Sequence, residues 1–128
     1  MDEATSILLV DDNEDARVTV ARILDMAGYS VIQAPNAKVA AVLLKEHTPD
    51  LVITDIFMPE GDGFEVMSAL KEREKRIPVI AISGGGVTQG LDVLGIAQRL
   101  GAVKVLYKPF ARRQLLDAIT EALGGAPG

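Results

Sequence analysis

Residues 50–63 read DLVITDIFMPEGDG, a short apolar run that closes on an acid, Asp55, and then passes into a segment with proline and glycine. Two similar apolar runs precede it and two follow it, and none of them alternates with polar residues. Short runs of this kind, mostly β-branched or aliphatic, predict strands that are buried on both faces, as in a parallel sheet. The runs are Ile7–Val10, Val31–Ala34, Leu51–Thr54, Val79–Ile82 and Val103–Tyr107.

Apolar residues at helical spacing occupy each gap between these runs and also follow the last one. Gly28 and Gly101 come directly after two of these patterns, where glycine commonly ends a helix, and Pro49 follows another. Five strand–helix units in a row predict a doubly wound α/β fold. The patterns are carried by Val20, Ile23, Leu24 and Ala27; Ala37, Ala40, Ala41 and Leu44; Phe64, Met67 and Leu70; Val93, Ile96, Ala97 and Leu100; and Leu115, Leu116, Ile119 and Leu123.

Length, residue usage and charge predict a soluble, cytoplasmic domain with no membrane or nucleic-acid partner. The chain has 128 residues, 48% of them apolar, which is typical of one globular domain. We expect a single domain over 1–128, with a core of about 6–123 and a flexible tail at 124–128. The absence of cysteine excludes disulfides and thiolate chemistry. The net charge of −5 argues against nucleic-acid binding, and no apolar run approaches the ~20 residues of a membrane span.

Polar residues stand where the predicted strands end. In doubly wound folds, functional groups collect at the carboxyl ends of the strands. The first run is followed by Asp11 and Asp12, the third by Asp55, the fourth by Ser83 and the fifth by Lys108. Acids brought this close repel one another, and a hard divalent cation among them makes the arrangement favourable. Carboxylate ligands suit Mg²⁺, which often bridges to a phosphate.

These side chains together suggest phosphoryl transfer. Asp55 is the natural nucleophile, because a carboxylate that attacks phosphorus gives an acyl phosphate. Lys108 suits a site that holds a phosphoryl oxygen with a point charge, and Ser83 can donate to another oxygen. Mg²⁺ and Lys108 would neutralise the charge on the transferred group.

Taken singly, each of these residues has a simpler interpretation. Asp12 or Asn13 could cap a helix, and Asp55 could belong to a turn. Ser83 could be an ordinary loop serine and Lys108 a solvated lysine. The three glycines after Ser83 are a flexible turn, because no Gly-Lys-Ser/Thr follows them. The joint placement of the five residues at strand ends favours the functional interpretation.

Four stretches give the chain a resemblance to a known family. They are LLVDDNEDAR (8–17), DLVITDIFMPEGDGFEV (50–66), IPVIAISG (77–84) and VLYKPF (105–110). In this order and spacing, the chain resembles the receiver domain of two-component response regulators, of the chemotaxis-receiver type, from Ile7 to about Leu123. The resemblance implies a (βα)5 flavodoxin-like fold with a five-stranded parallel sheet in the order 2-1-3-4-5.

The resemblance also implies a role for each matching residue. Asp55 corresponds to the phosphoacceptor. Asp12 would ligate Mg²⁺ directly, Asp11 would do so directly or through water, and the carbonyl of Phe57 would be a further ligand. By the same resemblance, Ser83 provides the hydroxyl that moves toward the phosphoryl group. Lys108 matches the family's invariant lysine, and the bond from it to Pro109 would be cis.

The chain departs from the family pattern at two positions. Most receivers have an aromatic residue three places before the lysine, but here that residue is Val105. Tyr107 shares a strand face with Val105 and is a candidate substitute. Phe57 is apolar where a polar side chain could orient an attacking water, so we expect slow autodephosphorylation.

We therefore expect a signalling protein that catalyses only its own phosphorylation and dephosphorylation. A histidine kinase or phosphotransfer domain would present the phosphoryl group, and Asp55 would accept it. Motion of Ser83 and the following loop would then shift a two-state equilibrium at a surface that binds a downstream protein. The chain is expected to be monomeric. The surface comprises Ser83, Val87, Leu91, Lys104, Val105, Tyr107 and Arg112.

Alternatives remain open at this point. Because the chain ends after its fifth helix, we expect no output domain to follow. The protein could be a stand-alone regulator, a phosphorelay intermediate, or the excised receiver of a longer regulator or hybrid kinase. Outside the family, an aspartyl phosphatase usually has an acid where Phe57 stands. A flavodoxin-like nucleotide-binding module would need a phosphate loop where DDNEDA (11–16) is acidic.

Overall fold

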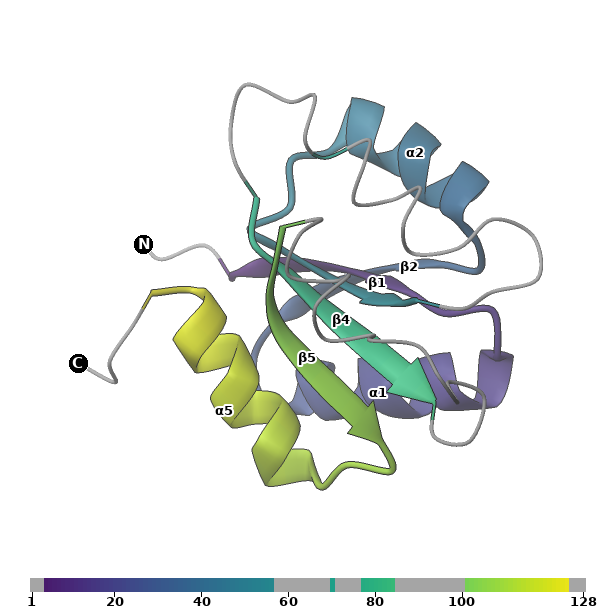
Figure 1. Ribbon diagram of the computed structural model, residues 1–128. Coiled ribbons are helices and arrows are strands. Elements are labelled where there is room, and N and C mark those ends of the chain that lie inside the picture. Colours follow the sequence, from purple (N-terminus) through teal and green to yellow (C-terminus); the bar gives the residue numbers. More distant parts are fainter. Residues whose placement is uncertain (1–3, 57–69, 71–76, 85–100, 125–128) are drawn as a thin grey trace.

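The computed structural model describes residues 4–56, 70, 77–84 and 101–124. In this part of the chain, parallel strands form one sheet in the order β2-β1-β3-β4-β5 (Figure 1). The doubly wound fold and the strand order predicted from the sequence are confirmed. The strands are β1 (Ser6–Val10), β2 (Ser30–Ala34), β3 (Leu51–Asp55), β4 (Val79–Gly84) and β5 (Ala102–Lys108).

The described helices cover both faces of the sheet. They are α1 (Glu14–Met26), α2 (Ala37–Glu46) and α5 (Arg112–Ala122). Helices α1 and α5 lie on one face and α2 on the other (Figure 1). The predicted helices at Phe64–Leu70, apart from Leu70 itself, and at Val93–Leu100 lie outside the described residues, as do residues 125–128 of the predicted tail. None of the described helices has the length and apolar character that a membrane span requires.

Burial differs between the inner and the edge strands. All five residues of β3 are buried, and β1 and β4 are buried except at one end. In the edge strands, only one of the five residues of β2 and two of the seven residues of β5 are buried. The prediction that every strand is buried on both faces is therefore wrong for β2 and β5, because an edge strand has a neighbour on one side only.

The core consists of two apolar clusters, one on each face of the sheet. Alternate residues of a strand point to opposite faces, so each inner strand contributes to both clusters. Burial of this apolar surface is the main favourable contribution to folding. The cluster under α2 includes Leu8, Val10, Val52, Val79 and Ala81. The cluster under α1 and α5 includes Ile7, Leu9, Leu51, Ile53, Ile80 and Ile82.

Gly28 ends α1 as the sequence predicts. Its φ of 97° lies in the left-handed region, which an L side chain rarely adopts. The Gly28 amide donates to the carbonyl of Asp25, and the Tyr29 amide donates to that of Leu24. This pair of hydrogen bonds is the Schellman motif, which satisfies carbonyls at a helix end. The chain then enters β2 directly.

Replacement of Gly28 should destabilise the fold through backbone strain alone. A Cβ at this position would meet no atom within 4 Å, so no clash contributes. We expect Gly28→Ala to lower the free energy of unfolding by about 1–2 kcal/mol, the cost of a left-handed L residue. Urea denaturation measures this value. Gly28→Asn should lose less, because asparagine tolerates this region better. Equal stability of Gly28→Ala and wild type would contradict the prediction.

Candidate functional site

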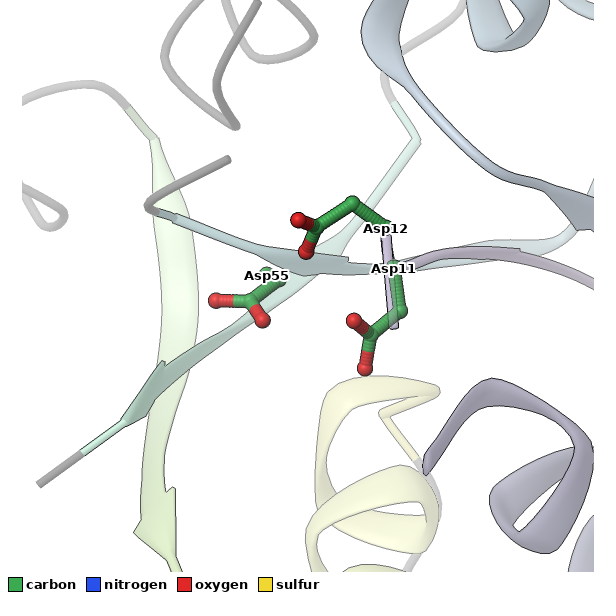
Figure 2. Close-up of side chains that lie close together, drawn as sticks. All are labelled: Asp11, Asp12 and Asp55. Atoms are coloured by element: carbon green, nitrogen blue, oxygen red, sulfur yellow. The ribbon is translucent and has the colours of Figure 1, made fainter. Parts of the chain in front are cut away.

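The register of the strands brings the predicted acids together. Val10 of β1 pairs with Thr54 of β3, so Asp11 and Asp55 follow at the same level on neighbouring strands. Figure 2 shows the carboxylates of Asp11, Asp12 and Asp55 beside the ends of β1 and β3. Asp11 and Asp55 are buried, with 3% and 7% of their surface exposed, whereas Asp12 is exposed. Because the chain leaves β1 toward β2 and returns to β3 on the other side, this is the topological switch point of the sheet.

The three carboxylates fit a small divalent cation. One oxygen from each acid lies within 4.8 Å of the others. Mg²⁺ binds oxygen at about 2.0–2.1 Å, so two ligands on opposite sides of the ion lie about 4.2 Å apart. The spacing of the acids is thus close to what the ion needs, and exposed Asp12 leaves room for the waters that Mg²⁺ retains. The Phe57 carbonyl, predicted as a further ligand, lies outside the described residues.

Lys108 reaches the same acids from the end of β5. Its Nζ lies 3.1 Å from Oδ2 of Asp55 and 3.4 Å from Oδ2 of Asp11. The ammonium thus bridges two buried carboxylates, and the alternative of a merely solvated lysine does not fit. The peptide bond from Lys108 to Pro109 is cis, as the resemblance implied.

The environment of Lys108 keeps it charged. Burial on its own would lower the pKa of the ammonium, but attraction to Asp55 and Asp11 and hydrogen bonds to both outweigh it. The pKa of Lys108 is therefore raised above its usual value of 10.5. At neutral pH the site contains a positive charge that lies within contact distance of the Asp55 carboxylate.

Asn13, and not Asp12, caps the first helix. The Ala16 amide donates to Oδ1 of Asn13 at 2.9 Å, and helix α1 begins at the next residue after Asn13. The Asn13 amide in turn donates to Oδ1 of Asp11 at 3.0 Å. The capping role open to Asp12 in the sequence is thus filled by its neighbour. Both oxygens of Asp11 have partners, whereas Asp12 forms no hydrogen bond or ion pair with other described residues.

Ser83 is fully buried within β4, one residue before the strand ends. Its Oγ has no hydrogen-bond partner among the described residues. A buried hydroxyl without a partner is unfavourable, and such groups are uncommon in folded proteins. The loop-serine interpretation is therefore wrong, and the hydroxyl is available to a new acceptor.

Tyr107 is the strand neighbour of Ser83. In the register of β4 and β5, Val105 pairs with Ala81 and Tyr107 pairs with Ser83. Val105 and Tyr107 therefore share a face of β5, as predicted, and this is the face that carries α2. Val105 is half-buried against the core, whereas Tyr107 is 51% exposed.

The remaining residues of the predicted partner surface are partly described. Lys104 forms an ion pair with Glu121 of α5, and Arg112 is the exposed first residue of α5. Val87 and Leu91 lie outside the described residues. The described exposed part of this surface therefore lies along β5 and at the start of α5, whereas Ser83 is fully buried in β4 and does not itself reach the surface.

Sequence reasoning missed one residue beside the acids. Arg17 of α1 donates from Nη1 to the carbonyl oxygen of Asp11 at 2.9 Å and from Nε to Oε1 of Gln33 at 3.1 Å. Arg17 lies in the stretch LLVDDNEDAR, six residues after Asp11. Because α1 begins at Glu14, an arginine in its first turns can fold back onto the end of β1, which is the signal that could have identified it.

Comparisons with known proteins agree with this geometry. A family model described as the response regulator receiver domain matches residues 7–120. The chain is 36% identical to chemotaxis protein CheY of Bacillus subtilis over 121 residues, which cover 94% of this chain and 98% of that protein. A crystal structure of a CheY-like receiver domain protein from Methanospirillum hungatei has a TM-score of 0.85 and 28% identity, covering 95% of both chains.

Some relatives are much longer. The C4-dicarboxylate transport transcriptional regulatory protein DctD of Pseudomonas aeruginosa is 35% identical over 122 residues, which cover 95% of this chain and 26% of that protein. The chain thus spans about a quarter of that regulator's length and nearly all of the chemotaxis protein.

Proposed function

Because this chain belongs to the family of response regulator receiver domains, we propose that it signals through phosphorylation of Asp55 in an Mg²⁺-dependent reaction. The donor would be a histidine kinase or phosphotransfer protein, and the chain would act in the cytoplasm. The single observation that supports this most strongly is the convergence of Asp11, Asp12 and Asp55 with Lys108 at the carboxyl edge of the sheet. The whole of residues 1–128 would act as one domain.

The three acids would hold the metal in different ways. Asp11, whose two oxygens already accept hydrogen bonds, would act directly or through water. Asp12 and Asp55 would ligate directly, with the Phe57 carbonyl as a further ligand. When bound, Mg²⁺ would neutralise the acids and the incoming phosphoryl oxygens.

The proposed reaction uses Asp55 as nucleophile. A carboxylate oxygen attacks phosphorus, the bond from phosphorus to the donor's imidazole nitrogen breaks, and its electron pair stays on that nitrogen. Lys108, 3.1 Å from Asp55, is placed to contact a phosphoryl oxygen as the charge moves. The product is an aspartyl phosphate on the chain itself, so the protein is a signalling module and not an enzyme with turnover. Autodephosphorylation would be slow.

The phosphoryl group would switch a protein-binding surface. Its oxygens offer an acceptor to the buried hydroxyl of Ser83, which now has no partner among the described residues. Inward movement of Ser83 would disturb its strand neighbour Tyr107 and the adjoining Val105. Together with Arg112, Val87 and Leu91, these residues would form the surface for a downstream protein. We propose that the domain is monomeric and binds no nucleic acid itself.

Mg²⁺ binding tests the metal site without any phosphodonor. A ligand present at 100 times its Kd stabilises the folded state by about 2.7 kcal/mol. We expect Mg²⁺ to raise the melting temperature of the wild type and to have little effect on Asp12→Asn, which removes an exposed ligand. Differential scanning calorimetry measures both.

The matched control is Asp25→Asn, an equal change of charge at an exposed position on α1. It should respond to Mg²⁺ as the wild type does. If Mg²⁺ did not change the melting temperature of the wild type, the proposed metal site would be refuted. An equal loss of response in Asp25→Asn would attribute the effect to net charge and not to ligation.

A further inference from the structure

Residue 11 is held at every polar group of its backbone and side chain. Its amide donates to the carbonyl of Ala34 at 3.1 Å, which fixes the exit from β1 against the end of β2. Its carboxylate accepts from the Asn13 amide and from Lys108. Its carbonyl oxygen accepts from Arg17 Nη1 at 2.9 Å. Arg17 therefore restrains the carbonyl group of Asp11, which is the part of the residue that is bonded to Asp12.

The carbonyl of Asp11 and the amide of Asp12 belong to one planar peptide group. Fixing the direction of that carbonyl fixes the plane, and the plane sets where the Cα atom of Asp12 lies. Asp12 has no restraining partner of its own among the described residues. The backbone that Arg17 holds therefore sets the position from which the Asp12 carboxylate reaches the site.

Arg17 is itself fixed by a second contact. Its Nε donates to Oε1 of Gln33 at 3.1 Å, and Gln33 is the neighbour of Ala34 on β2. Arginine is suited to this task because its planar guanidinium presents several donors in a rigid fork, which lysine lacks. The two bonds connect α1, the end of β1 and the end of β2 through one side chain.

We propose that Arg17 is a positioning residue for the metal site: it orients the peptide between Asp11 and Asp12 so that both acids face the cation beside Asp55. This inference rests on the proposed function, since it requires that the acids bind Mg²⁺. In this role Arg17 would act through the Asp11 carbonyl and would ligate neither the cation nor the phosphoryl group.

Positioning and simple electrostatics predict opposite outcomes for loss of Arg17. A positive charge near a cation site repels the cation, so electrostatics alone predicts tighter Mg²⁺ binding when the charge is removed. Loss of positioning predicts weaker binding. Groups that orient metal ligands commonly contribute 10–100-fold to affinity, so we expect the positioning effect to exceed the repulsion.

The test is isothermal titration of Mg²⁺ into the full chain without any phosphodonor. We expect Arg17→Met to bind Mg²⁺ about tenfold more weakly than the wild type. Arg17→Lys keeps the charge but not the forked set of donors, and it should bind Mg²⁺ nearly as weakly as Arg17→Met. Arg22→Met is the matched control, because it removes an exposed arginine from the same helix. It should bind as the wild type does or slightly more tightly.

The outcomes separate this inference from the proposed function. Wild type that fails to bind Mg²⁺ overturns both. If the wild type binds Mg²⁺ and Arg17→Met binds it as tightly or more tightly, the positioning role is overturned and the proposed metal site stands. If Arg17→Met does not fold, Gln33→Leu is the deciding variant. It alters an exposed side chain and removes the hydrogen bond that holds the Arg17 guanidinium. Weaker binding by Gln33→Leu supports the role, and unchanged binding overturns it.

Discussion

The Asp55→Asn variant is expected to gain no mass when it is incubated with Mg²⁺ and acetyl phosphate, whereas the wild type gains one phosphoryl group. Asparagine has the size of aspartate but lacks the anionic oxygen that attacks phosphorus. Asp12 forms no ion pair with Lys108 among the described residues, and the ammonium lies closer to Asp55 than to Asp11, at 3.1 against 3.4 Å. We therefore expect complete loss, measured by intact mass.

The matched control for this experiment is Asp117→Asn, which changes an exposed acid of α5. It should be phosphorylated at the rate of the wild type. A phosphoryl group that still appears on Asp55→Asn would mean that another residue is the acceptor. Thermal unfolding of both variants confirms that any loss is chemical and not a failure to fold.

Lys108→Met is expected to separate phosphorylation from metal binding. The ammonium lies 3.1 Å from Asp55, where it can stabilise charge on the transferred group. Loss of one such stabilising group commonly lowers a rate on the order of 100-fold. We expect a decrease of that size in the rate of phosphorylation by acetyl phosphate, measured from the mass increase over time.

Mg²⁺ should bind Lys108→Met at least as tightly as it binds the wild type. Lys108 is a cation that contacts two of the three acids, so its removal leaves them without their counterion. Titration of Mg²⁺ measures this, with Lys45→Met, an exposed lysine of α2, as the control. If Lys108→Met lost Mg²⁺ binding together with phosphorylation, its role would be to maintain the shape of the site and not to stabilise transferred charge.

Much of the fold could be predicted because a buried parallel strand appears in the sequence as a continuous apolar run. All five runs became strands, with ends displaced by at most two residues. The apolar pattern alone could not distinguish inner from edge strands, because Val31 and Val103 are as apolar as Val52. Their exposure follows from strand order, which the apolar pattern does not contain.

The site could be predicted to the extent that it follows from strand ends. One topological rule brought Asp11, Asp12, Asp55 and Lys108 to one edge, and the structure places them there. The pattern could not decide between Asp12 and Asn13 as the helix cap, since both residue types cap well. That choice depends on where the first helical turn begins.

Two features of the site required coordinates. The contact of Arg17 with Gln33 joins residues 16 positions apart and depends on how β2 packs beside α1. The complete burial of Ser83 depends on its lying inside β4, although its sequence context of three glycines suggests a loop. Side-chain contacts across elements leave no periodic signal in one sequence.

Borohydride reduction of the phosphorylated wild type offers the most direct measurement, because it converts an aspartyl phosphate into homoserine and so marks the acceptor in the sequence. After incubation with acetyl phosphate, peptide mapping should find homoserine at position 55, and omission of Mg²⁺ should abolish it. Homoserine at position 11 or 12, a phosphoryl group on Ser83, or equal labelling without Mg²⁺ would contradict the assignment of Asp55 as the metal-dependent phosphoacceptor.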